Sequence, residues 1–191
     1  MNIADSYQAA IASEFNPVIC LGLELKPYSG GHDVLLEAFG SPFINESLPS
    51  FDDLVIGVLI CSQHYQEAAR TLKSRWLTKL VKYWGWRARK LNPVTETLRF
   101  KSYVSEGRKF PDDVCYKVDM DGRELSSPSN QRMKILLMRE IGMTEHEFLS
   151  RPLALSVSDW CTIQELDGVM GSMSVNDKAM FAEAKRRRNG A

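Results

Sequence analysis

The sequence has no hydrophobic run long enough to cross a membrane. The longest apolar run, from Leu54 to Cys61, has eight residues, whereas a membrane-spanning helix needs about 20. The first residues include Asp5 and Glu14, and they lack the basic stretch followed by an apolar stretch that a secretory signal requires. We therefore expect a soluble protein that has no membrane partner and remains in the cytoplasm of the cell that makes it.

Cysteine pairs with the spacing of a zinc or redox site are also absent. The cysteines lie about 40 or more residues apart and form no C-x-x-C pair. Cys61 and Cys161 are in apolar segments, where a free thiol behaves as a small hydrophobic group. We expect buried free thiols at the four positions, Cys20, Cys61, Cys115 and Cys161.

Histidine is scarce, with three residues in the chain. His32 precedes Asp33, but the further His and Asp ligands of metal-dependent phosphohydrolases do not follow in their pattern. The alternative places this pair at a helix start, where the helix dipole favours the Asp33 carboxylate. His146, between two glutamates, lacks the H-E-x-x-H spacing that places two histidines on one helix face. The sequence therefore predicts no metal site.

Motifs for nucleophilic catalysis and phosphate binding are missing as well. The chain contains no G-x-S-x-G, no G-x-x-x-x-G-K-[ST] and no G-x-G-x-x-G after a strand. We predict a protein that is not an enzyme, with no catalytic residues and no cofactor. An enzyme with an unfamiliar site near His32 and Asp33 is the competing hypothesis.

The chain carries no net charge, with 24 acidic and 24 basic residues in 191. Whole-molecule charge therefore predicts neither nucleic-acid nor membrane binding. Hydrophobic residues make up 44% of the sequence, which is ordinary for a globular protein. A chain of this length buries roughly 70% of its unfolded surface, enough for a core without covalent staples.

Helix signals recur along the chain. Ser50 with Asp53, and Thr144 with Glu147, have capping-box spacing, and Ser156 with Asp159 and Ser174 with Asp177 repeat it. We expect helices over residues 33–39, from Ser50, over 63–90 with a break at Gly85, and over 94–104. Further helices are expected from 128 to Gly142 and in three short pieces after 143, with a helical lead-in over 3–15. A buried strand is the competing interpretation for the segment after Ser50.

The remaining segments lack helical periodicity. Residues 18–25 are apolar and predict a strand or an extended arm, and residues 27–31 predict a turn. Residues 106–127 hold a strand-like stretch at 114–118 and a hairpin-like Asp121-Gly122. We predict a mainly α fold, a compact bundle of short helices with a small loop or β insertion around residues 106–127. It forms one domain over 1–191, or two parts, 1–105 and 128–191, around the insertion.

One stretch of the chain is strongly basic. No acidic residue lies between Glu67 and Glu96, and cations there alternate with Trp76, Trp84 and Trp86. A solvated cationic face with the tryptophans turned into the core explains it, as does contact with an acidic protein, a nucleic acid or an anionic membrane surface. The basic residues are Arg70, Lys73, Arg75, Lys79, Lys82, Arg87, Arg89 and Lys90.

Two N-terminal segments resemble small helical proteins of bacteriophage and prophage tail-morphogenesis regions, the tail assembly chaperone-like proteins. The first reads Leu21-Gly22-Leu23-x-Leu25-Lys26-Pro27-Tyr28-Ser29-x-Gly31-His32-x-x-Leu35-Leu36 and closes with Gly40-Ser41-Pro42-Phe43. The second runs from Asp53-Leu54 through Val58 to Ile60-Cys61-Ser62. Residues 142–165, with Arg151-Pro152-Leu153, Trp160 and Glu165, are similar to the closing helices of that family.

The resemblance implies a non-enzymatic role in virion assembly. Such proteins keep the long tape-measure protein soluble while tail-tube subunits polymerise around it, so the implied partner is a tape-measure or tail-tube protein. The alternatives are a structural virion or adaptor protein, and a nucleic-acid-binding accessory protein that uses residues 70–90. For partner contact we select six residues, each of which also has a core or turn explanation: Lys26, Pro27, Tyr28, His32, Trp84 and Trp86.

Overall fold

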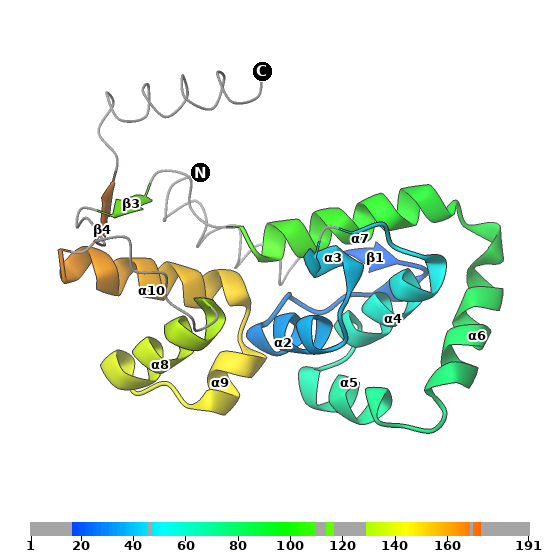
Figure 1. Ribbon diagram of the computed structural model, residues 1–191, viewed down its shortest axis with the longest axis horizontal. Coiled ribbons are helices and arrows are strands. Elements are labelled where there is room, and N and C mark those ends of the chain that lie inside the picture. Colours follow the sequence, from blue (N-terminus) through cyan, green and yellow to red (C-terminus); the bar gives the residue numbers. More distant parts are fainter. Residues whose placement is uncertain (1–16, 46, 110–113, 117–128, 169, 173–191) are drawn as a thin grey trace, which may run out of the picture.

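The computed structural model describes residues 17–45, 47–109, 114–116, 129–168 and 170–172. Helices dominate these residues and the strands are short, so the prediction of a mainly α fold is confirmed (Figure 1). The first elements are β1 (Ile19–Cys20), β2 (Leu23–Glu24), α2 (Gly30–Ala38), α3 (Pro42–Asn45), α4 (Phe51–Cys61), α5 (Tyr65–Leu72) and α6 (Leu77–Arg87). They are followed by the 3-10 helix η1 (Ala88–Lys90), α7 (Pro93–Gly107), β3 (Val114–Tyr116), α8 (Ser129–Ile141), α9 (Glu145–Ser150), α10 (Leu153–Leu166) and β4 (Met170–Ser172).

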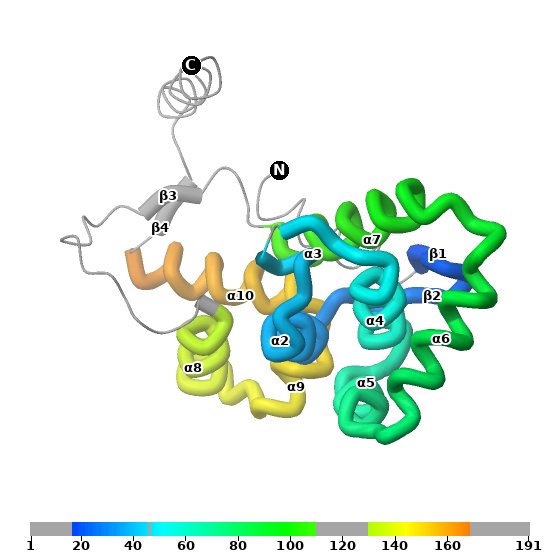
Figure 2. The backbone as a smooth tube through the Cα atoms, turned by 45° about the vertical axis from the view of Figure 1, so that its right-hand side comes forward, coloured from blue at the N-terminus to red at the C-terminus, as the bar shows by residue number. Residues whose placement is uncertain are grey.

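Helix α4 is the central element of the first half of the fold. It packs against α2, α5, α6 and α7 (Figure 2), and seven of its residues are buried, which accounts for its nearly continuous apolar sequence. The strand interpretation of this segment is wrong. At its start the predicted capping box is confirmed, because the Ser50 hydroxyl accepts from the Asp53 N–H and the Asp53 carboxylate accepts from the Ser50 N–H.

The long helix predicted over 63–90 is divided into α5 and α6. The break lies at residues 73–76, not at Gly85, which is inside α6. The Ser74 hydroxyl accepts a hydrogen bond from the Trp76 N–H in the turn between the helices. This turn lets both helices pack on α4, which one straight helix of that length would not do, since helices follow a core only by curving or breaking.

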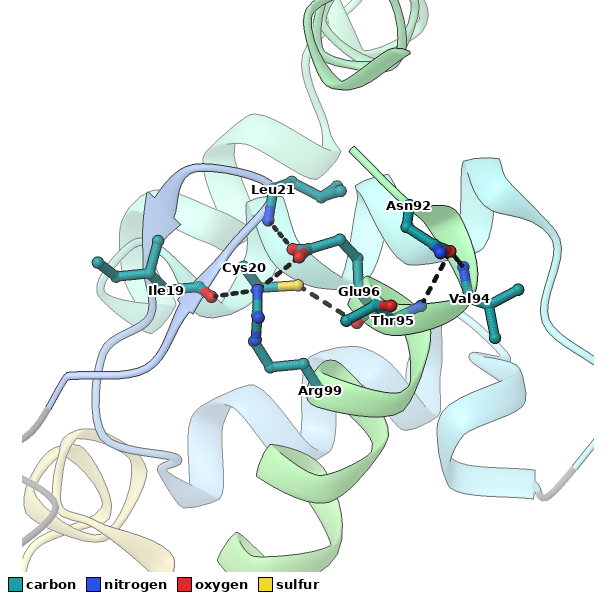
Figure 3. A network of polar contacts seen from close by, with 8 residues as sticks. All are labelled: Ile19, Cys20, Leu21, Asn92, Val94, Thr95, Glu96 and Arg99. Atoms are coloured by element: carbon teal, nitrogen blue, oxygen red, sulfur yellow. Dashed lines mark hydrogen bonds and ion pairs between the residues drawn. The ribbon is translucent and has the colours of Figure 1, made fainter. Parts of the chain in front are cut away.

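Strands β1 and β2 form a two-residue hairpin that docks on α7 (Figure 3). The loop residues Leu21 and Gly22 have positive φ angles of 50° and 76°, as a type I′ turn requires. Leucine adopts this conformation at a cost, and the Glu96 carboxylate offsets it by accepting the Leu21 N–H at 2.6 Å. Arg99 pairs with Glu96 and donates to the Ile19 carbonyl, so α7 holds the hairpin from two sides.

Helix α2 begins at Gly30, three residues before the predicted start at residue 33, so Gly30 and Gly31 belong to the helix and not to the turn predicted over 27–31. The reason is a capping box in which Ser29 is the N-cap and His32 takes the place of the usual glutamate. The glycines allow close packing: a Cβ on Gly31 would lie 2.5 Å from Tyr65. Gly40 follows the helix with φ 68°, and α3 then begins at Pro42.

Helices α8, α9 and α10 form a second group beside α2 (Figure 1). The Thr144–Glu147 capping box and the end of α8 before Gly142 (φ 67°) are confirmed. The helix start expected at Ser156 is wrong, because α10 begins at Leu153 and continues through this buried serine. The lead-in expected over 3–15, the helix expected from Ser174 and the helix start expected at residue 128 lie outside the described residues.

The segment predicted as an insertion begins later than expected. Helix α7 continues through Glu106 to Gly107, where a Cβ would lie 2.5 Å from the Tyr28 side chain. The strand at Val114–Tyr116 is confirmed, but it pairs antiparallel with β4 at the far end of the chain. The Asp121-Gly122 hairpin lies outside the described residues. Among the helices of the described part, none is long and apolar enough to cross a membrane.

Candidate binding sites

The buried carboxylate of Asp33 joins the two helix groups. Asp33 is fully buried in the first turn of α2. Tyr28 donates its hydroxyl to Oδ1 at 2.7 Å, the Arg108 Nε lies 2.9 Å from Oδ1, and Asn130 of α8 donates to Oδ2. Burial and the Asp33 charge raise the pKa of Tyr28 far above its usual value, so this hydroxyl is a fixed donor. The network is satisfied within the protein and is structural.

His32, beside Asp33, is also held on both ring nitrogens. Its Nε2 lies 2.8 Å from the Gln63 carbonyl, which can only accept, and its Nδ1 lies 3.2 Å from the Ser29 backbone nitrogen. These partners fit the neutral imidazole with the proton on Nε2. Burial lowers the pKa of His32, which favours the same neutral state. The His32 ring is therefore held neutral and in one orientation by its hydrogen bonds.

A cavity of about 250 Å³ lies next to His32. It is formed by the segment before α2, the start of α5 and the end of α9, and we call it the Lys26 pocket. The Tyr65 hydroxyl contacts His146 Nδ1 at 3.0 Å, and Ser150 donates to the His146 carbonyl at 2.7 Å, so α5 and α9 are connected at its edge. The lining residues are Lys26, Pro27, Ser29, His32, His64, Tyr65, Gln66, Ser150 and Pro152.

The Lys26 backbone is fixed on both sides. Its N–H donates to the Cys61 carbonyl at 2.8 Å, and its carbonyl accepts from the Tyr103 hydroxyl at 2.6 Å. The side chain is partly buried, and its ammonium group forms no ion pair with a carboxylate of the described residues. The nine lining residues include no Asp or Glu, so no carboxylate of the described lining balances the charge of Lys26.

The second candidate site is the exposed side of residues 70–90, which span the end of α5, the turn after it, α6 and η1. Eight cations and three aromatic side chains are exposed there, and none of the cations forms an ion pair with a described carboxylate. On α6 the exposed members fall at helical spacing on one face, opposite the buried Val81. We call the exposed residues of this segment the basic aromatic surface: Arg70, Lys73, Arg75, Trp76, Lys79, Lys82, Tyr83, Trp86, Arg87, Arg89 and Lys90.

The tryptophans of this segment do not share one environment. Trp84 is partly buried and packs against the core, whereas Trp76 is 50% and Trp86 62% exposed. The interpretation that turns the tryptophans into the core is therefore wrong for two of the three. Lys79 Nζ lies 4.1 Å from the centre of the Trp76 ring, a cation–π contact, and Trp86 is the most exposed of these rings.

The six residues predicted to contact a partner lie in different places. Lys26, Pro27 and His32 line the Lys26 pocket, and Trp86 lies on the basic aromatic surface. Tyr28 is buried against Tyr103 and bonded to Asp33, and Trp84 faces the core. Sequence reasoning missed His64, Tyr65 and Gln66 in the pocket, because only the tertiary fold brings them to Lys26. The spacing of Lys79, Tyr83 and Trp86 on one helix face was the signal for the surface.

Cys20 and Cys61 are buried free thiols, as predicted, and Cys161 is buried as well. The side chain of Cys115 lies outside the described part of the structure. Burial, and then the Glu96 charge, raise the pKa of Cys20 to about 12, so its thiol is protonated. In the described part of the chain, no three His, Cys, Asp or Glu side chains gather in a way that could hold a metal ion. Comparison of the sequence and fold with protein-family models, curated proteins and solved structures gave no match.

Proposed function

We propose that the protein is a non-enzymatic assembly factor that binds a tail component of a bacteriophage or prophage. The tape-measure protein is the partner that the resemblance of residues 21–62 implies. The observation that carries the binding part of the proposal is the basic aromatic surface, where Trp76, Tyr83 and Trp86 are exposed among eight cations. Exposed aromatic residues and arginine are enriched at protein interfaces, where each buries a large area.

The surface favours a partner that is acidic and carries apolar side chains. The cations of α5 and α6 have no described carboxylate to pair with, so an acidic partner would complete their electrostatic interactions. Helix α6 presents this exposed face over 11 residues, which suits a helical segment laid along it. A long helical chain with apolar stripes and acidic residues has these properties.

Co-expression with the tape-measure protein of the same genome tests the proposal. The tagged protein should retain the tape-measure chain through purification and keep it soluble. Trp86→Ala combined with Lys79→Glu should abolish the complex, because the change removes the most exposed ring and reverses a charge beside Trp76. Both side chains are exposed, so the variant should unfold at the wild-type temperature.

A matched variant, Lys101→Glu, reverses an exposed charge on α7 outside the surface and should leave the complex intact. If neither the tape-measure protein nor a tail-tube protein is retained, the assembly role is wrong. Retention that is insensitive to the α6 variant would move the interface elsewhere on the molecule. Mass spectrometry of purified particles distinguishes an assembly factor, which leaves the particle, from a structural virion or adaptor protein, which stays.

A nucleic-acid-binding role is the second candidate. The alternation of cations with exposed rings on α6 is also the arrangement on which single strands stack and pair their phosphates. Binding to a single-stranded oligonucleotide would then weaken steeply with salt. Neutralising Lys79, Lys82 and Arg87 together would flatten that dependence. Oligonucleotide binding that changes with neither salt concentration nor these substitutions would exclude the nucleic-acid-binding role.

A further inference from the structure

The Lys26 pocket is a second place where a basic side chain has no carboxylate partner among the described residues. Unlike the exposed face of α6, it is a cavity. Its walls come from three separate parts of the chain, around Lys26, around Tyr65 and around Ser150. The contacts of Tyr65 and Ser150 with His146 join two of these walls. The cavity is therefore a consequence of the tertiary fold.

The charge of the pocket has one sign. Lys26 contributes the basic side chain, and its backbone is held by hydrogen bonds to Cys61 and Tyr103. His64 and Gln66 add polar groups to the lining, and no lining residue is acidic. A lysine ammonium group without a carboxylate partner among the lining residues can pair with an anion that enters the pocket.

The size and walls restrict the anion. A volume of about 250 Å³ is below that of sites for drug-sized ligands, so the pocket suits a small molecule or a single side chain. Pro27 and Pro152 form rigid apolar walls, and His32 is held neutral by its two hydrogen bonds. A single cation in the lining matches a singly charged group. A doubly charged phosphate would leave one charge without a partner.

We propose that the Lys26 pocket binds one carboxylate group, paired with the Lys26 ammonium group and bounded by His64, Gln66 and the two prolines. The group comes either from a free small carboxylate or from a glutamate side chain of another protein. The site is independent of the basic aromatic surface and shares no residue with it, so either proposal can fail alone.

Two-dimensional amide NMR of the full chain tests this at constant ionic strength. The probes are sodium acetate and a blocked tripeptide with a central glutamate between alanines; the same peptide with glutamine is the neutral control. We expect saturable shifts of the His64, Tyr65 and Gln66 amides with the glutamate peptide, and none with the glutamine peptide. Saturation by acetate as well identifies a free small anion as a sufficient ligand, whereas saturation by the peptide alone identifies a protein side chain.

Lys26→Gln should weaken the binding at least about tenfold, since a charged hydrogen bond is lost. The glutamine keeps both backbone hydrogen bonds, and Lys26→Arg should retain binding. Lys101→Gln, an exposed change elsewhere, should bind as the wild type does. The proposal is overturned if neither probe gives saturable shifts in the wild-type protein, if the glutamine peptide binds equally, or if Lys26→Gln binds with unchanged affinity.

Discussion

At the scale of single residues, Asp33 has the most demanding environment. Its carboxylate is fully buried and contacts Tyr28, Arg108 and Asn130. We expect Asp33→Ala to lower the free energy of unfolding by about 3 kcal/mol, the low end for breaking a buried ion pair, because the Arg108 side chain is 39% exposed and water partly replaces the lost partner. Urea denaturation measures the change.

Asp52→Ala is the matched control for Asp33. Asp52 is exposed in the first turn of α4, where its interaction with the helix dipole contributes less than about 1 kcal/mol. Similar losses for both variants would mean that the Asp33 network contributes no more than an ordinary first-turn aspartate does.

His32 makes stability depend on pH. Burial lowers its native-state pKa, while the unfolded chain protonates it near the ordinary value of 6.5. The unfolded state therefore binds more protons below that pH, and stability falls as pH decreases through 6.5 toward the native-state pKa. His32→Gln should flatten the free energy of unfolding between about pH 5 and pH 8. An unchanged slope in His32→Gln would contradict the assignment.

Individual roles were only partly visible in the sequence. The placement of Asp33 in a first helical turn was predicted, because the dipole argument needs only local sequence. Its partners were not, since Arg108 and Asn130 are 75 and 97 positions away. The Lys26 pocket was also only partly predictable. Lys26 was selected from its neighbours in the sequence, but the neutral state of His32 beside it depends on the Gln63 carbonyl, 31 residues away.

At the scale of elements, alanine substitution of two helical glycines should change the stability of the protein in opposite directions. A Cβ on Gly57 of α4 would lie 2.7 Å from the buried Phe100 ring, which is held edge-on by Phe43. Gly57→Ala should therefore destabilise the protein by about 1–3 kcal/mol through overpacking. A Cβ on Gly85 of α6 would meet only Phe51 at 3.7 Å, so Gly85→Ala should stabilise it by up to about 1 kcal/mol, since alanine favours helix.

Thermal and urea unfolding of the two alanine variants give the comparison directly. If Gly57→Ala is neutral, then α4 and α7 can separate without loss, and the close approach at Phe100 does not hold them. If Gly85→Ala destabilises the protein, strain from the turn between α5 and α6 reaches Gly85, beyond the hydrogen bonds of that turn.

Helix starts were the most predictable elements. Ser50 and Thr144 begin α4 and α9 because a capping box is complete within four residues. The division of residues 63–90 was not predictable in this way, because both halves keep helical periodicity and the turn at 73–76 is favoured by packing on α4. Ser156 shows the opposite error: it has cap spacing but is buried within α10, where tertiary packing overrides a local signal.

At the scale of the whole molecule, the two helix groups should unfold together. The Leu153 N–H donates to the Tyr28 carbonyl at 2.7 Å, Asn130 donates to Asp33, and α2 packs on α9. We expect urea unfolding followed by far-UV circular dichroism and by tryptophan fluorescence to give one coincident transition. Two separate transitions would instead support the division into 1–105 and 128–191.

The mainly α class followed from helical periodicity and caps repeated along the chain. The pairing of β3 with β4 did not, because strand partners more than 50 residues apart leave no local pattern. The predicted tail partner rests on sequence resemblance alone and stays a prediction, since the fold and sequence comparisons gave no relative.

The position of α6 at one end of the molecule has a kinetic consequence (Figure 1). The chain is neutral overall, so the eight cations of residues 70–90, which include α6, are balanced by an excess of eight acidic residues elsewhere. Such a molecule has a dipole moment, and the field of an acidic partner would rotate it during diffusion so that α6 arrives first. Added salt shortens the range of this torque, so it should slow association more than it speeds dissociation.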